Sequence, residues 1–102
     1  MLVFLPDNLL DFDSDSTIAT LKGYRRVFEN NDGRFPEFIY TGEDYDIVYG
    51  LLFDLSEDDM ERLDTFQGIG MGLHQRRKEW AAIDEEIMRA VVYDYQGYLL
   101  PV

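Results

Sequence analysis

One segment, residues 56–74, constrains the fold of this 102-residue chain more than any other. Ser56 and Asp59 have the spacing of a capping box, in which the first side chain accepts a hydrogen bond at the start of a helix. Three glycines between positions 68 and 72 prevent that helix from continuing far past Gln67. The segment therefore predicts a helix of about residues 57–67 that ends in a glycine-rich turn and presents the polar side chain of Gln67.

Met60, Leu63 and Phe66 follow one another at three-residue spacing, which predicts a single apolar stripe that packs the helix on a sheet. The rest of the chain is rich in β-branched and aromatic residues separated by turn signals, as in strands. We therefore expect an α+β fold with one main helix, a small mixed β-barrel or strongly curved sheet, in a single domain of residues 1–102. The predicted strands are residues 1–5, 17–28 (as one strand or two), 35–41 and 45–55 and the two arms of a hairpin, 73–83 and 87–95.

Glycines and aromatic residues refine this expectation. Gly23 predicts a bend, and Gly50, inside the most apolar strand, predicts a bulge or the close approach of another backbone or a ligand. Residues 30–33 carry a strong turn signal, and the apolar tail of residues 98–100 is expected to return to the body of the domain. Six aromatic residues are expected mostly in the core: Tyr24, Phe28, Phe53, Phe66, Trp80 and Tyr93.

The chain is strongly acidic, with 21 Asp and Glu against 9 Lys and Arg and a net charge of −12. This balance argues against direct contact with nucleic acid or anionic membranes, which need clustered basic residues. It leaves three alternatives: simple solubility, docking on a basic protein partner, and imitation of nucleic acid. No secretory signal or membrane span is recognised, so a cytoplasmic setting is expected.

The composition offers few residues for metal binding or thiol chemistry. The chain has no cysteine and one histidine, His74, so neither thiolate catalysis nor a multi-histidine metal site is expected, and no cofactor is predicted. Asp11, Asp13 and Asp15 have the first ligand positions of a calcium loop. However, Ser16 stands where the loop needs glycine and Lys22 where it needs glutamate, so a solvated acidic loop is the better interpretation.

Four short motifs follow one another along the chain: Ala19-x-Leu21-x-Gly23-Tyr24, Val48-x-Gly50-x-Leu52, Leu63-Asp64-x-Phe66-Gln67-Gly68 and Ala90-x-Val92-Tyr93. Each motif alone is weak, whereas the set is moderately specific. Together they resemble the gamma-glutamylcyclotransferase-like family in order and spacing, from about residue 17 to residue 95. The resemblance implies a mixed β-barrel with flanking helices and a pocket at one end.

Active members of that family are similar in two features that this sequence lacks. A glutamate takes a proton from the substrate amine, which then attacks the γ-carbonyl and closes a ring, and here that position is Gln67, whose amide cannot accept the proton at neutral pH. A Tyr-Gly-Ser loop after the first strand binds the substrate carboxylate through backbone groups. The positions aligned with that loop and the leucine that follows it are Pro6, Asp7, Asn8 and Leu9.

These departures favour a domain that has lost cyclotransferase catalysis. Proline removes a backbone N–H, Asp7 adds negative charge where a carboxylate would dock, and the segment before Thr17 is shorter than usual, which thins one wall of the pocket. The predicted ligand-binding residues are those of the first loop together with Gln67 and His74. A binding, sequestering or inhibitory role follows, of the kind that viruses encode, with a small molecule in the residual pocket or a protein on the acidic surface.

Two other functions stay open. The first is an active γ-glutamyl cyclotransferase or amide-cleaving enzyme with Asp64 or His74 as the base. Against it, Asp64 can be a solvated helix carboxylate, and His74 can be a residue of the pocket rim. The second is an acidic mimic of nucleic acid. Gln67 can also be a polar helix end without a role, or a substitution made to trap a ligand, although the altered first loop argues against the latter.

Overall fold

The computed structural model describes residues 1–29 and 35–97, and the predicted turn at 30–33 and the tail at 98–100 lie outside them. Within the described residues, no helix is long and apolar enough to cross a membrane. The strands in chain order are β1 (Leu2–Leu5), β2 (Ser16–Lys22), β3 (Tyr24–Glu29), β4 (Phe35–Tyr40), β5 (Ile47–Asp54), β6 (His74–Ile83) and β7 (Glu86–Tyr95). One helix, α1 (Glu57–Phe66), and a 3₁₀ turn, η1 (Ile69–Met71), separate β5 from β6.

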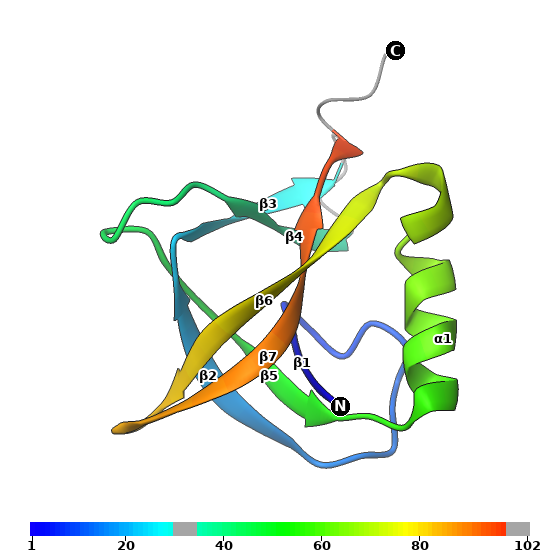
Figure 1. Ribbon diagram of the computed structural model, residues 1–102, viewed down its shortest axis with the longest axis horizontal. Coiled ribbons are helices and arrows are strands. Elements are labelled where there is room, and N and C mark those ends of the chain that lie inside the picture. Colours follow the sequence, from blue (N-terminus) through cyan, green and yellow to red (C-terminus); the bar gives the residue numbers. More distant parts are fainter. Residues whose placement is uncertain (30–34, 98–102) are drawn as a thin grey trace.

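The strands form a closed barrel with an extension. The sheet runs in the order β1-β5-β2-β6-β7-β4-β3, and a parallel pairing of β1 with β7 closes its first five strands into a ring. The pairing of β4 with β7 is also parallel, whereas the other neighbours are antiparallel, so the barrel is mixed as predicted. Figure 1 shows α1 standing against one side of this barrel.

One edge of β7 is shared between two strands, and this arrangement positions the site. The edge pairs with β1 as far as Phe4, opposite Val92, and two residues later it pairs with β4 through Phe38, opposite Asp94. The rings of Phe4 and Phe38 stack across the junction with their centroids 5.3 Å apart. The loop after β1 therefore begins beside β4, at the end of the barrel where α1 ends and β6 begins (Figure 1).

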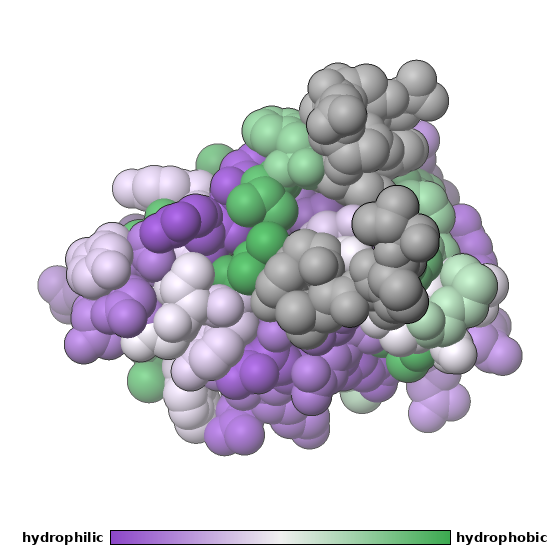
Figure 2. Space-filling view, turned by 90° about the horizontal axis from the view of Figure 1, so that it is seen from above, coloured by the Kyte–Doolittle hydropathy of each residue, from purple (hydrophilic) through white to green (hydrophobic). Residues whose placement is uncertain are grey.

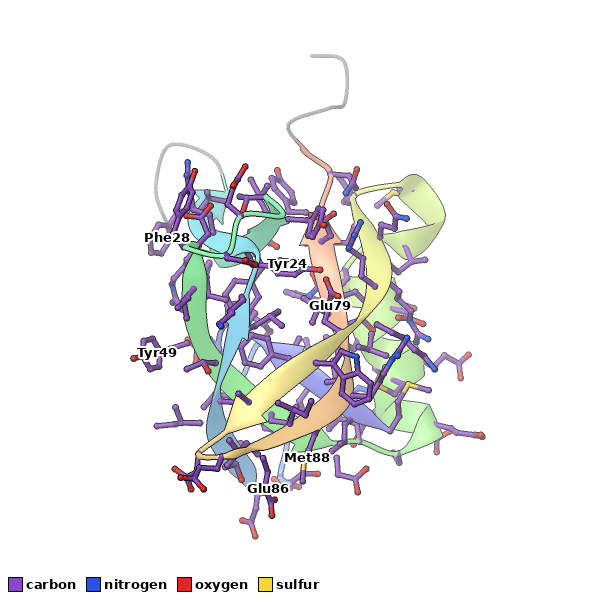
Figure 3. The ribbon with its side chains drawn as sticks, turned by 60° about the vertical axis from the view of Figure 1, so that its left-hand side comes forward. Tyr24, Phe28, Tyr49, Glu79, Glu86 and Met88 are labelled. Atoms are coloured by element: carbon purple, nitrogen blue, oxygen red, sulfur yellow. The ribbon has the colours of Figure 1, made fainter. Side chains whose placement is uncertain are left out.

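Two apolar clusters hold the fold together, one inside the barrel and one between the barrel wall and α1. Alternate residues of β1 enter different clusters: Phe4 belongs to the first, and Val3 and Leu5 belong to the second. All three are fully buried, as the continuously apolar run of residues 1–5 predicts. The side of the barrel without a helix faces solvent, so Tyr49 and Phe28 point outward there (Figure 3).

The helix begins as predicted and buries a different face from the one predicted. The Ser56 Oγ accepts a hydrogen bond from the Asp59 N–H at 3.2 Å, and Met60 and Leu63 are buried. Phe66, the expected third member of the stripe, is 44% exposed, so that prediction is wrong. At about 100° per residue, two steps of three residues rotate a side chain about 120° from Met60, whereas seven residues return it to the same face. Gln67 occupies that place and is 3% exposed.

The glycine predictions hold, and half of the aromatic predictions do not. Gly23, at φ +85°, forms the bend between β2 and β3, and a Cβ at Gly50 would lie 2.6 Å from the Phe4 ring. Tyr24, Phe53 and Tyr93 are buried, whereas Phe28, Phe66 and Trp80 are exposed. The exposed three were expected in the core: Phe28 and Trp80 lie outside it because one helix covers only part of the barrel wall, and Phe66 because it lies off the buried face of α1.

Candidate functional site

Gln67 follows the last residue of α1, where the chain turns sharply. Its N–H donates to the Leu63 carbonyl at 2.8 Å, and Gly68 then adopts a left-handed φ of +64°. A Cβ at Gly68 would lie 2.6 Å from the Leu73 side chain, so glycine is required there by both conformation and space. The Gln67 side chain is thereby fixed in a buried position, and no other described residue makes a hydrogen bond to its carboxamide.

His74, the first residue of β6, is bonded through both ring nitrogens. Nδ1 donates to the Gln67 carbonyl oxygen at 2.6 Å, since a carbonyl can only accept. Nε2 contacts Oε2 of Glu37, which lies in the middle of β4. Both side chains are more than nine-tenths buried. A single histidine therefore links the end of α1, the start of β6 and the centre of β4.

The Glu37 and His74 side chains are hydrogen-bonded to each other in a buried position. Nδ1 already carries a hydrogen, and the close approach of Nε2 to a carboxylate oxygen requires one more proton between them. The rings of Tyr93 and Tyr95 pack against the imidazole, with centroids 6.4 and 5.3 Å from it. Neither nitrogen of His74 keeps an unused lone pair in this arrangement, so the imidazole cannot take a ligand proton directly.

Asp64, the other candidate base, is held by three donors. Its carboxylate accepts hydrogen bonds from Arg76 Nε at 2.9 Å, from Arg76 Nη2 at 2.6 Å and from the Tyr93 hydroxyl at 2.6 Å. Burial, together with the hydrogen bond and charge of Asp64, raises the pKa of Tyr93, which keeps the phenol protonated as a donor. Asp64 therefore ties α1 to β6 and β7, and acting as a base would break these bonds.

The first loop satisfies many of its own polar groups. The Asn8 N–H donates to Asp7 Oδ1 at 2.8 Å, and the Asn8 amide bonds the Phe12 N–H and carbonyl at 2.8 and 3.1 Å. The Pro6 carbonyl accepts from Arg26 Nη1 of β3 at 3.2 Å, and Leu9 packs on the cluster under α1. Asp7 thus places its own carboxylate on a loop N–H, and Asn8 closes the loop.

No group of three or more acidic or histidine residues in the described parts of the chain could hold a metal ion. Asp11, Asp13 and Asp15 are all exposed, as expected of a solvated loop. Figure 2, which views the barrel from the end that carries β3, β4 and η1, shows a surface that is mostly hydrophilic with a narrow hydrophobic strip.

Comparison with known protein families agrees with this architecture. Residues 8–101 match the family described as gamma-glutamyl cyclotransferase, AIG2-like. The chain belongs to this family. The resemblance inferred from the four short motifs is therefore confirmed, while the match begins at Asn8 and leaves Pro6 and Asp7 before it. No curated protein sequence matches the chain significantly.

Solved structures show the same gamma-glutamyl cyclotransferase fold at low sequence identity. A solution structure of an Arabidopsis thaliana protein has a TM-score of 0.74 at 20% identity over 93% of this chain and 68% of its own. A structure described as gamma-glutamyl cyclotransferase has a TM-score of 0.71 at 16% identity, with the same two coverages of 93% and 68%. A human protein described as uncharacterized has a TM-score of 0.62 at 15% identity and is covered over 54% of its length.

This gamma-glutamyl cyclotransferase-like domain also has a polar cluster inside the barrel mouth. The Tyr24 hydroxyl donates to Glu79 Oε2 at 2.5 Å, and the two side chains point toward one another in Figure 3. Arg77 lies over the Tyr40 ring, 3.8 Å from its centroid, and 3.9 Å from Asp94. Burial, followed by the Glu79 hydrogen bond, raises the pKa of Tyr24. The cluster therefore holds two acidic side chains, Glu79 and Asp94, close to one arginine.

Among the residues of this family member, Glu37 was missed by sequence reasoning. Its only sequence signal is an acidic side chain in the middle of the apolar and aromatic run FPEFIY of β4. A buried carboxylate in such a run needs a partner, and the chain has one histidine to offer. Of the predicted residues, the structure brings Gln67 and His74 together, and it places Asp64 in a separate cluster with Arg76.

Proposed function

We propose that this domain binds a small molecule between the loop after β1 and the end of α1, without the glutamate-dependent chemistry of its family. The observation that carries the proposal is Gln67. Its side chain is buried at the family's base position, and its carboxamide bonds no other described residue. An amide can donate and accept hydrogen bonds to a ligand, but it cannot accept a proton at neutral pH.

The first loop supports binding over catalysis. Pro6 has no N–H, and the Asn8 N–H is already occupied by the Asp7 carboxylate. A substrate carboxylate would have to displace that internal carboxylate and approach its negative charge. Docking of a substrate carboxylate on this loop is therefore weakened together with the base, which favours a role without the family's catalysis.

The competing enzymatic function has weaker support in the geometry. Asp64 is held by Arg76 and Tyr93, and both nitrogens of His74 are occupied by Gln67 and Glu37. A cytoplasmic binding or sequestering module remains our assignment, and docking of a basic protein on the acidic surface stays a prediction.

Calorimetry and a product assay test the proposal together. We expect γ-glutamyl-alanine to bind to the wild-type protein without release of 5-oxoproline, which chromatography would detect. Gln67→Glu restores a carboxylate at the base position and should give measurable product, whereas Gln75→Glu, the same change at an exposed position of β6, should not.

Two results would contradict the proposal. Wild-type turnover to 5-oxoproline would show that a base is present after all. Absence of binding for γ-glutamyl-alanine and for glutaryl-alanine, its analogue without the amine, would remove the small-molecule role and leave the acidic surface as the remaining candidate.

A further inference from the structure

We infer that Glu37 is the residue that receives the primary ammonium group of the bound ligand. This inference rests on the proposed function and names the ligand class for the same site: a molecule with a free amine beside a group that bonds the Gln67 carboxamide. The acidic side chain needed to hold an amine is present in this domain, on β4 instead of at the end of α1.

The bonding of the Glu37 carboxylate leaves one oxygen for a ligand. Oε2 contacts His74, and no other described residue makes a hydrogen bond to Oε1. Glu37 is 5% exposed, so a hydrogen bond to its carboxylate is strengthened by the low dielectric of its surroundings. A primary ammonium group supplies up to three N–H donors and a compensating charge, and is therefore the ligand group that best completes this carboxylate.

His74 acts as a positioning residue for Glu37. Its Nδ1 is fixed by the Gln67 carbonyl and its Nε2 by the carboxylate, so the imidazole sets the distance between β4 and the end of α1. The rings of Tyr93 and Tyr95 hold the imidazole in place. Glu37 is consequently separated from the backbone carbonyl of residue 67 by a single imidazole, and we extend the inference to one small ligand that contacts both side chains.

His74 is the ion-pair partner that the described residues supply to Glu37. The proton between them makes the Glu37 and His74 pair neutral as a whole, and the Asp64 carboxylate, which lies in a separate cluster, is paired with Arg76. No lysine or arginine among the described residues forms an ion pair with Glu37. An ammonium group therefore meets the oxygen that His74 leaves unbonded, with no lysine or arginine side chain paired to it among the described residues.

Calorimetric titration with γ-glutamyl-alanine and glutaryl-alanine isolates the amine. We expect the wild-type protein to prefer the amine-bearing ligand by about tenfold or more, as a charge-assisted hydrogen bond predicts. Glu37→Gln keeps the side-chain shape and should reduce this preference to about twofold or less while glutaryl-alanine still binds. Glu43→Gln, an exposed control of the same chemistry, should leave the preference unchanged.

Each outcome separates this inference from the proposed function. Equal binding of the two ligands by wild type leaves the proposed function standing and overturns the role of Glu37, and this comparison needs no variant to fold. Preference retained in Glu37→Gln, with circular dichroism showing a folded protein, also overturns it. Wild-type release of 5-oxoproline that Glu37→Gln abolishes would support amine contact at Glu37 and overturn the binding-only function. If neither ligand binds, both the proposed function and the role of Glu37 are wrong.

Discussion

Gly50 of β5 is the position where an added methyl group should do most damage to the barrel. A Cβ there would lie 2.6 Å from Phe4 Cζ and 2.7 Å from the Leu5 carbonyl oxygen. Neither neighbour can give way easily, since the Phe4 ring is stacked on Phe38 and the carbonyl belongs to the backbone of β1. Overpacking of a core costs roughly 1–3 kcal/mol of stability, and because this clash involves the backbone, Gly50→Ala should lower the free energy of unfolding by about 3 kcal/mol.

The magnitude can be measured against a glycine that has room. At Gly70, in η1, an added Cβ meets nothing within 4 Å, and its φ is not positive, so Gly70→Ala should be neutral or stabilising by up to about 1 kcal/mol. Urea unfolding followed by far-ultraviolet circular dichroism gives the free energy of unfolding of both variants. In thermal unfolding, the Tm of Gly50→Ala should fall by about 10–20 °C. If the two variants unfold within about 0.5 kcal/mol of each other, the close packing of β1 on β5 inferred here is wrong.

Two further predictions concern buried tyrosines. Tyr93→Phe removes a hydrogen bond to Asp64 and should lower the free energy of unfolding by about 1–2 kcal/mol, less than the loss of a fully buried charged hydrogen bond because Asp64 is partly exposed. Urea unfolding measures this change, and Tyr49→Phe, at an exposed position, should leave the free energy of unfolding almost unchanged. An equal loss in both variants would contradict the role of the Tyr93 hydrogen bond. The raised pKa values of Tyr24 and Tyr93 mean that folding favours the protonated phenols, so this stability is complete below pH 10 and is lost as pH rises further. Absorbance titration should show these two ionising after the other tyrosines, and ionisation of all seven together near pH 10 in the folded protein would refute it.

Much of the fold could be read from local patterns. The start of α1 follows from Ser56 and Asp59, and its end follows from Gly68, because capping and left-handed turns depend on residues a few positions apart. The double burial of β1 follows from its unbroken apolar run, and the close contact at Gly50 follows from a glycine inside a central strand. The same patterns identified Gln67 as the side chain at the helix end.

The sequence by itself determined the elements, the family and the loss of a carboxylate at position 67. Tertiary structure alone decided what surrounds that position, because the deciding contacts join residues far apart in the chain. Glu37 reaches His74 across 37 positions, and Asp64 reaches Tyr93 across 29. Barrel closure through β7 brings these strands to one end, and no local pattern encodes that closure. The acid that sequence reasoning found missing from α1 is therefore supplied, in our inference, by the strand beside it.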